Sequence, residues 1–281
     1  MHDDNGFEPD EQAATRQEMV AAYVRRSKRK QGVGIRKAFL QQGGRGRHAR
    51  PGPLAKLVRN GDHLALNAYL FARMLGSHDP WDVQLDSGVW VRALNLDLDD
   101  RKATAARGLV SKALRRLEDD KLITRSRAGR KSVVYPLHES GNGDPYSEIS
   151  GERDDPYLQI PLIYWTNDWH RKLHLAGLAM LLIALDEQRE FWLPADDVKK
   201  WYGISVSTAN RGYAELEEHG LLASKYRKVR NELSADGVDR RLMRRLTGDF
   251  AKPTKRPKLE KIVADSTPEA GLPKVPRLRA V

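Results

Sequence analysis

The stretch 193–222, LPADDVKKWYGISVSTANRGYAELEEHGLL, decides the fold predicted for this chain. Its hydrophobic spacing predicts a short helix over Ala195–Trp201 and a second helix over roughly Ser207–His219. Between them, Gly203 can take the positive φ that a sharp turn between two helices requires. The stretch therefore predicts two helices joined by a tight turn.

The second of these helices has a start signal and two distinct faces. Ser205 or Ser207 can cap it, because a serine hydroxyl accepts a hydrogen bond from the free backbone N–H groups of a first helical turn. Apolar positions such as Tyr213 and Leu216 are expected to bury against the first helix. The exposed N-terminal end, the part of a recognition helix that meets base edges in a major groove, then carries Ser207, Thr208, Asn210 and Arg211.

A similar pattern occurs earlier, in residues 102–137, KATAARGLVSKALRRLEDDKLITRSRAGRKSVVYPL. Apolar residues recur there at helical spacing, with arginine and lysine on the other face. The apolar stripe consists of Leu109, Val110, Ala113, Leu114 and Leu117. This segment is therefore predicted to contain a second amphipathic, cationic helix.

Two strands are predicted directly after that helix. They cover Leu122–Arg125 and Val133–Leu137, and the tight basic turn Ala128–Lys131 joins them. A recognition helix followed by a hairpin with a cationic tip is the arrangement of a winged helix, in which the helix lies in one groove and the wing reaches phosphates or an adjacent minor groove.

The composition points to a polyanionic partner. The chain has 281 residues with 49 Lys+Arg against 38 Asp+Glu, a formal charge of +11 and a sequence pI of about 9.8. Such an excess most often accompanies nucleic-acid binding. The absence of cysteine excludes disulfides, thiolate zinc sites and cysteine nucleophiles. No apolar run approaches the ~20 residues of a membrane span, so we expect no membrane contact and a cytoplasmic, nucleoid-associated protein.

The expected fold is mainly α with small β-hairpin wings, an α+β class with two winged helix-turn-helix domains. Composition shifts predict a basic, largely disordered N-terminal arm and C-terminal tail, and a flexible linker rich in glycine, serine and aspartate. The predicted boundaries are 1–53 for the arm, 54–138 for the first domain, 139–156 for the linker, 157–248 for the second domain and 249–281 for the tail.

The secondary structure of some segments inside these domains is not decided by the sequence. Val89–Leu94 fits either a strand or a helix, and Arg240–Leu246 fits either the second strand of a wing or a closing helix. A helix is expected over Trp169–Glu187 and a short strand over Phe191–Leu193. Residues 41–53, rich in glycine, arginine and proline, are either a solvated tail or a flexible arm along DNA phosphates or a minor groove. One of the aspartates Asp97, Asp99 and Asp100 is expected to cap the first recognition helix.

The sequence contains no complete catalytic or metal-binding motif among those considered. His170 and His174 share a helical spacing, but a metal site needs a third ligand and no HExxH-type glutamate lies between them. No phosphate-binding loop of the form GxxxxGK[ST] is present. Core packing accounts for the tryptophans better than a ligand pocket does. We therefore predict no enzyme activity, no metal and no cofactor.

The motifs resemble a known superfamily. The stretch 201–222 is similar to the winged helix-turn-helix of GntR-type and MarR-type bacterial regulators, and Lys112–Tyr135 resembles the recognition helix and wing of the same superfamily. GntR regulators carry a large ligand-binding domain after one winged helix, whereas a second winged helix occupies that space here. Two winged helices in one chain also resemble plasmid replication initiators, whose paired domains bind repeated origin sequences.

The leading hypothesis is sequence-specific binding of double-stranded DNA, most simply by a transcriptional regulator whose two recognition helices contact successive half-sites. Arginine and asparagine suit guanine and adenine edges, and the lysines and wing arginines suit phosphates. The predicted contacts are Lys102, Thr104, Arg107, Lys112, Arg115, Arg130, Lys131, Ser207, Thr208, Asn210, Arg211, Lys225, Arg227 and Lys228.

Two other hypotheses remain. One is replication initiation or partition on a plasmid or phage, with added contacts to the replication machinery. The other is a protein-interaction module in which one winged helix binds no DNA. A homodimer and contacts to the transcription machinery are compatible with each DNA-binding hypothesis.

Overall fold

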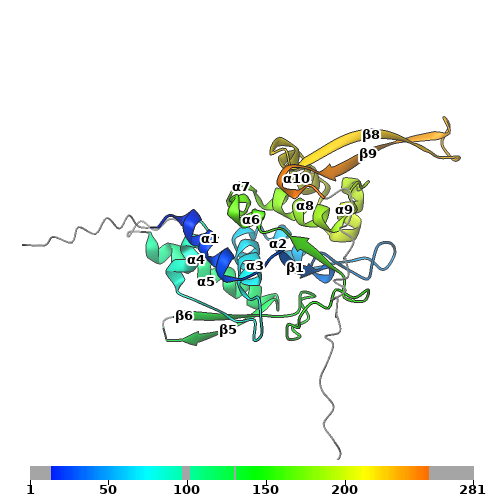
Figure 1. Ribbon diagram of the computed structural model, residues 1–281. Helices are drawn as coiled ribbons and strands as arrows, with labels where there is room; N and C mark the ends of the chain where they lie inside the picture. Colours follow the sequence, from blue (N-terminus) through cyan, green and yellow to red (C-terminus); the bar gives the residue numbers. More distant parts are fainter. Residues whose placement is uncertain (1–13, 97–101, 130, 253–281) are drawn as a thin grey trace, which may run out of the picture.

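The computed structural model describes residues 14–96, 102–129 and 131–252. Within these ranges the chain is a mixed α+β protein in which ten α-helices accompany nine strands, and the strands form four small antiparallel sheets (Figure 1). Several predictions fall outside the described residues, namely those for residues 1–13, Asp97, Asp99, Asp100, Arg130 and residues 253–281.

One order of elements occurs twice along the chain: a helix, a short edge strand or bridge, two helices, and a β-hairpin. The first repeat consists of α3 (His63–Leu75), β4 (Val83–Leu85), α4 (Ser87–Ala93), α5 (Ala103–Asp119), β5 (Ile123–Ala128) and β6 (Lys131–Pro136). The second repeat consists of α8 (Leu175–Asp186), the bridge residue Phe191, α9 (Ala195–Tyr202), α10 (Val206–Glu218), β8 (Leu222–Arg230) and β9 (Val238–Leu246). Figure 1 shows the two hairpins projecting from opposite sides of the molecule.

In the first repeat, the predicted hairpin is confirmed and the open segment 89–94 is helical. Strands β5 and β6 pair in register from Ile123 opposite Pro136 to the tip. Helix α4 begins after Asp86, whose carboxylate accepts a hydrogen bond from the backbone N–H of Gly88 at 2.7 Å. The sequence did not predict β4, a strand of only three residues that pairs with β6 and completes the sheet order β4-β6-β5.

In the second repeat, the predicted turn between two helices is confirmed. Gly203 has φ +66° and ends α9. Ser205 caps α10, because its hydroxyl accepts a hydrogen bond from the backbone N–H of Thr208 at 3.2 Å. The open segment 240–246 is a strand. The short strand predicted over Phe191–Leu193 is not formed, and only Phe191 makes an isolated bridge to the hairpin, opposite Arg244.

The apolar stripe of α5 is confirmed with one correction. Val110, Ala113, Leu114 and Leu117 are buried, as predicted, but Leu109 is 47% exposed. The buried stripe begins at Ala106, and Leu109 falls at the edge of that stripe on the helix surface.

The helix predicted over residues 169–187 is wrong, because the segment is divided. It contains α7 (Trp169–Lys172) and α8, preceded by α6 (Ile163–Thr166), and Leu173 between α7 and α8 is extended. Glu215 of α10 explains the break: its carboxylate accepts hydrogen bonds from the backbone N–H of His174 at 2.6 Å and of Gly177 at 2.9 Å. A carboxylate at this position satisfies free N–H groups and favours a new helix start.

The predicted disordered N-terminal arm is wrong over residues 14–53. This segment contains α1 (Arg16–Arg26), β1 (Val33–Arg36), a 3-10 turn, β2 (Gln41–Gln42) and β3 (Arg50–Pro51), and α2 (Pro53–Arg59) follows directly. Strand β1 pairs with β7 (Tyr157–Ile160), which precedes the second repeat. The few apolar residues of the arm are placed where they fill the core, and the buried ones include Val20, Val24, Val33, Ile35, Phe39 and Leu40.

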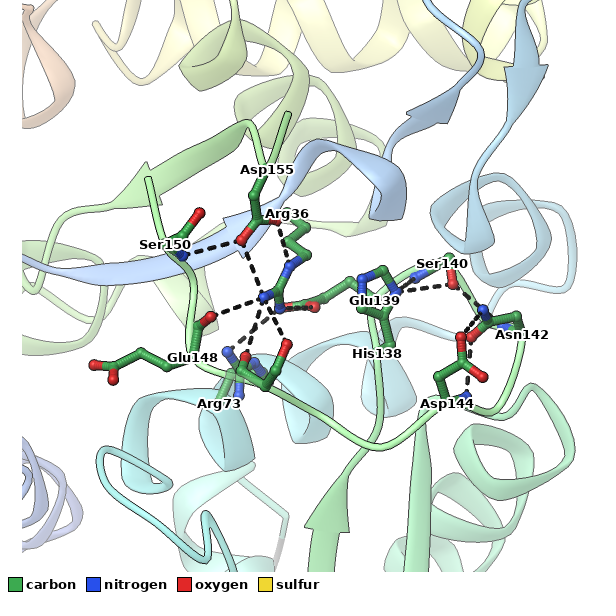
Figure 2. Close-up of polar contacts among 11 residues, drawn as sticks. Arg36, Arg73, His138, Glu139, Ser140, Asn142, Asp144, Glu148, Ser150 and Asp155 are labelled. Atoms are coloured by element: carbon green, nitrogen blue, oxygen red, sulfur yellow. Dashed lines mark hydrogen bonds and ion pairs between the residues drawn. The ribbon is translucent and has the colours of Figure 1, made fainter. Parts of the chain in front are cut away.

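The predicted flexible linker, residues 139–156, is also wrong, because Arg36 of β1 holds both of its ends (Figure 2). Arg36 donates to Glu139 at 2.9 Å and to Asp155 at 2.6 Å, and also to the backbone carbonyls of Ser147 and Glu148. The acidic, glycine-rich composition of this segment predicts a solvated chain. Instead, the carboxylates of Glu139 and Asp155 accept hydrogen bonds from the buried Arg36.

A second arginine completes this network. The Nη2 atom of Arg73 in α3 lies 3.3 Å from the Glu139 carboxylate, and its guanidinium lies 3.8 Å from the centroid of the Tyr146 ring. Glu139 therefore joins Arg36 and Arg73, and the segment 139–156 is fixed between the two repeats.

The predicted disordered C-terminal tail is wrong over residues 249–252. A 3-10 turn over Gly248–Phe250 buries Phe250, and the Lys252 ammonium donates to the carbonyl of Leu185 at 2.7 Å. The buried apolar residues of both repeats and of the N-terminal segment form one contiguous core rather than two. Among the described helices, none has the length and apolar character needed to span a bilayer.

Candidate nucleic-acid interface

A groove of about 960 Å³ lies between helix α5 and the hairpin β5–β6. Helix α5 lines it with Arg107, Ser111 and Arg115, which are spaced by four residues and so share one face of the helix. The hairpin contributes Arg125, Arg127 and Lys131 from the opposite side. Of these residues, the sequence predicts Arg107, Arg115 and Lys131 but not Arg125 and Arg127.

Four cations of this groove have no ion pair with any described residue, namely Arg107, Arg115, Arg127 and Lys131. Arg125 is different, because its guanidinium lies 2.6 Å from the Glu118 carboxylate. The acidic residues of the groove are likewise engaged: Glu118 with Arg125, and Asp86 with the start of α4. The described residues that line the groove therefore carry net positive charge, with five cations against two carboxylates.

The other predicted residues of α5 lie outside the groove. Lys112 is exposed on the face that also carries Leu109, and Lys102 and Thr104 are exposed at the start of the helix. Arg116 is exposed and forms an ion pair with the buried carboxylate of Asp62.

The N-terminal end of α10 has the exposure predicted for it. Ser207, Asn210 and Arg211 are exposed, whereas Thr208 is half-buried and shares a 2.8 Å hydrogen bond with the hydroxyl of Ser205. Thr208 thus helps to cap the helix, which was not foreseen.

The acidic half of α10 is mainly structural. Glu215 holds the start of α8, and Glu217 accepts a hydrogen bond from Ser224 of the hairpin. In the N-terminal half of the helix, Ser207, Asn210 and Arg211 are therefore the side chains that face solvent.

The hairpin β8–β9 carries cations on both strands. Arg227 stands directly opposite Arg241, and Lys228 stands opposite Arg240. Like charges in directly opposed positions destabilise a sheet. These facing cations therefore lower the stability of the hairpin. The arginines of the second strand are not among the predicted contacts, although the Arg-Arg pairs at 240–241 and 244–245 are a usable sequence signal.

Aromatic rings support several of these arginines. The Arg244 guanidinium lies 3.8 Å from the ring centroid of Tyr213 in α10, and Arg240 lies 5.2 Å from that of Tyr226. Arg241 lies 4.6 Å from the ring centroid of Trp192. The sequence predicts core packing for the tryptophans, but Trp192 is 43% exposed. Arg244 also donates to the carbonyl of Leu193 at 3.1 Å, which attaches the hairpin to the segment before α9.

The predicted cations of this hairpin do not share one face. Successive side chains of a strand alternate, so Lys228 lies on the face of Ser224, which contacts α10, and Lys225 and Arg227 lie on the other face. Arg227 there lies 3.9 Å from Glu190. The structure therefore separates the predicted residues into a groove in the first repeat, the α10 end, and two faces of the second hairpin.

The described residues contain no group of three or more His, Cys, Asp or Glu side chains placed to hold a metal ion. His170 is buried, and burial lowers its pKa from 6.5 to about 4, while His174 contacts Glu215. Comparison with known protein families, with curated proteins and with solved structures found no match.

Proposed function

We propose that each repeat is a winged helix-turn-helix and that the chain binds double-stranded DNA with sequence specificity. Helices α5 and α10 would be the recognition helices, and hairpins β5–β6 and β8–β9 the wings. The repeated element order supports this assignment, as does the strand order of the first sheet, in which the edge strand β4 lies beside the hairpin.

The observation that carries the proposal is the groove beside α5. It places four cations that have no ion pair with any described residue between an exposed helix face and a hairpin. A DNA duplex fits this charge distribution, because Arg127 and Lys131 of the hairpin can bind phosphates while the arginines on the face of α5 reach base edges. An exposed Leu109 on that helix adds an apolar group suited to a thymine methyl.

The two recognition helices differ, so the target site would be asymmetric. Helix α5 offers Arg107, Lys112 and Arg115, whereas α10 offers Ser207, Asn210 and Arg211. Arginine suits guanine and asparagine suits adenine. The buried contacts of Arg36 link the segments that join the two repeats, which supports a fixed spacing between the half-sites.

Transcriptional regulation is the simplest process for such a protein. Replication initiation is the second candidate, and the fixed pairing of two different repeats favours it, because one chain can then occupy one asymmetric unit of a repeated origin. Mapping of the protein on its genome separates the two: scattered promoter sites indicate a regulator, and a single array of repeats indicates an initiator.

Selection of bound duplexes from a random library, followed by gel shifts, tests DNA binding itself. We expect enrichment of one sequence, and Arg107→Ala/Arg115→Ala should weaken binding to it. Arg153→Ala is the matched control, since Arg153 is an exposed arginine in the segment 139–156. If the chain shifts no DNA but binds another protein with an affinity that does not depend on salt, it is a protein-interaction module instead.

A further inference from the structure

The loop between β2 and β3 covers residues 43–49, with the sequence GGRGRHA. It has a defined conformation and lies outside the two proposed winged helices. We call it the arginine loop. Its glycines Gly43, Gly44 and Gly46 all have positive φ. A Cβ on Gly43 would lie 2.3 Å from the carbonyl oxygen of His48, so the tight return of the loop requires glycine.

Arg45 anchors the arginine loop to the second repeat. Its guanidinium forms an ion pair with Glu187, whose side chain is 4% exposed, and donates to the Tyr202 hydroxyl at 3.2 Å. The same guanidinium lies 5.2 Å from the ring centroid of Trp201. Trp201 and Tyr202 form the end of α9, so the loop is attached next to the turn that leads into α10.

A second contact fixes the base of the loop at the same place. Pro51 follows the loop, and a Cβ on Gly203 would lie 2.7 Å from the Pro51 Cγ atom. Gly203 opens the turn that ends at Ser205, the N-cap of α10. The loop therefore starts and ends beside the helix end that, under the proposed function, points into a major groove.

Two further arginines of this segment take no part in anchoring the loop. Arg47 and Arg50 are exposed and form no ion pair with any described residue, and His48 is exposed between them. An anchored loop loses little conformational freedom when it binds, so its contacts contribute more to affinity than those of a free tail.

We infer that the arginine loop is a third DNA contact, in which Arg47 and Arg50 bind the sugar–phosphate backbone flanking the groove entered by α10. Arg45 is a positioning residue, because its guanidinium is used by Glu187 and the aromatic side chains. This inference rests on the proposed function and extends the DNA site beyond the helices and wings.

The first test measures affinity against salt concentration for Arg47→Ala/Arg50→Ala on the selected duplex. Loss of two phosphate contacts should reduce the slope of log K against log salt by about 1.8. Base preference should stay unchanged, because phosphate contacts carry no sequence information. Arg153→Ala should leave the slope unchanged, and equal thermal melting would show that the double variant is folded.

The second test uses the absence of cysteine from the chain. A cleavage reagent, iron-EDTA, is attached to His48→Cys, and to Glu152→Cys in the exposed part of the segment 139–156 as a control. We expect strand cleavage next to the α10 half-site from position 48 and no cleavage from position 152.

The outcomes distinguish this inference from the function on which it rests. If the wild-type chain selects a duplex but the double variant keeps the full salt slope, or position 48 cleaves nothing near the α10 half-site, the inference is wrong and the proposed function stands. If the wild-type chain binds no DNA, both are wrong.

Discussion

The Nη1 atom of Arg36 lies 2.9 Å from the Glu139 carboxylate, and both side chains are buried. One belongs to the N-terminal strand β1 and the other directly follows the first repeat, so this pair joins parts of the chain that the sequence suggested were independent. The core supports the same conclusion, because it is continuous through both repeats.

Removing one partner of this pair should destabilise the fold strongly. Glu139→Ala leaves Arg73 and part of Arg36 without a carboxylate, and an uncompensated buried charge costs about 3–5 kcal/mol. Guanidinium chloride unfolding should show a lower midpoint. Arg153→Ala, an exposed arginine, should change the free energy of unfolding little; equal effects of the two variants would contradict the prediction.

Arg211→Ala should relax base preference in the α10 half-site. Loss of a contact to a base edge costs ~1–3 kcal/mol on the preferred sequence and little on random DNA. Gel shifts on both duplexes measure the difference. An equal loss on both would show that Arg211 binds phosphate rather than a base.

Lys131→Ala should weaken binding to every sequence to a similar degree. Lys131 belongs to the groove of unpaired cations and begins strand β6, and loss of one phosphate contact lowers the slope of log K against log salt by about 1. Titrations at several salt concentrations check this. A change confined to one sequence would argue for a base contact instead.

Gly203→Ala should destabilise the protein more than Gly220→Ala does. Both glycines have positive φ, which costs a side chain roughly 1–2 kcal/mol. Only at Gly203 would the new Cβ also meet a neighbour, Pro51, whereas no atom lies within 4 Å of that position at Gly220. The difference between the two unfolding free energies measures this contact, and equal values would show that the Pro51 contact yields without cost.

Stability should fall as the pH drops from about 6.5 to about 4, because burial lowers the pKa of His170 to about 4. The unfolded chain binds the proton at a higher pH than the folded chain, so the stability present above this window is lost within it. Between pH 7 and pH 5 the loss should be about 2 kcal/mol by denaturant unfolding.

His170→Gln should remove most of that pH dependence. The comparison with wild type isolates His170 from Glu187, whose pKa burial raises and whose effect on stability has the opposite sign. An unchanged pH profile in the variant would show that His170 does not titrate on unfolding.

The helix-turn-helix segments were predictable because their signals are local. The 3.6-residue spacing of Tyr213 and Leu216 and the turn at Gly203 depend on neighbours in the sequence, and the structure agrees with them. The same holds for the tight turn between β5 and β6, where Gly129 has φ +60°.

The folded N-terminal segment was not predictable from composition, because its order depends on distant partners. Val33 and Ile35 are buried only because β1 pairs with β7. Arg36 and Glu139 each indicate a solvated surface when read alone, and only their contact across the fold makes them interior residues.

The candidate site was predictable in part for the same reason. Arg107 and Arg115 follow from helical spacing, but Arg127 enters the groove through the register of a hairpin. Arg241 was missed because the segment 240–246 fitted a strand or a helix, and only the strand places it opposite Arg227.

The central claim is most directly tested by methylation interference on a duplex selected by the wild-type chain. Two recognition helices should give two separate blocks of major-groove guanine contacts, about 10 base pairs apart on one face of the duplex. Arg107→Ala should remove contacts from one block only, and Arg211→Ala from the other. A failure to select any duplex, or one block that both variants affect equally, would contradict the claim that this chain carries two DNA-reading helices.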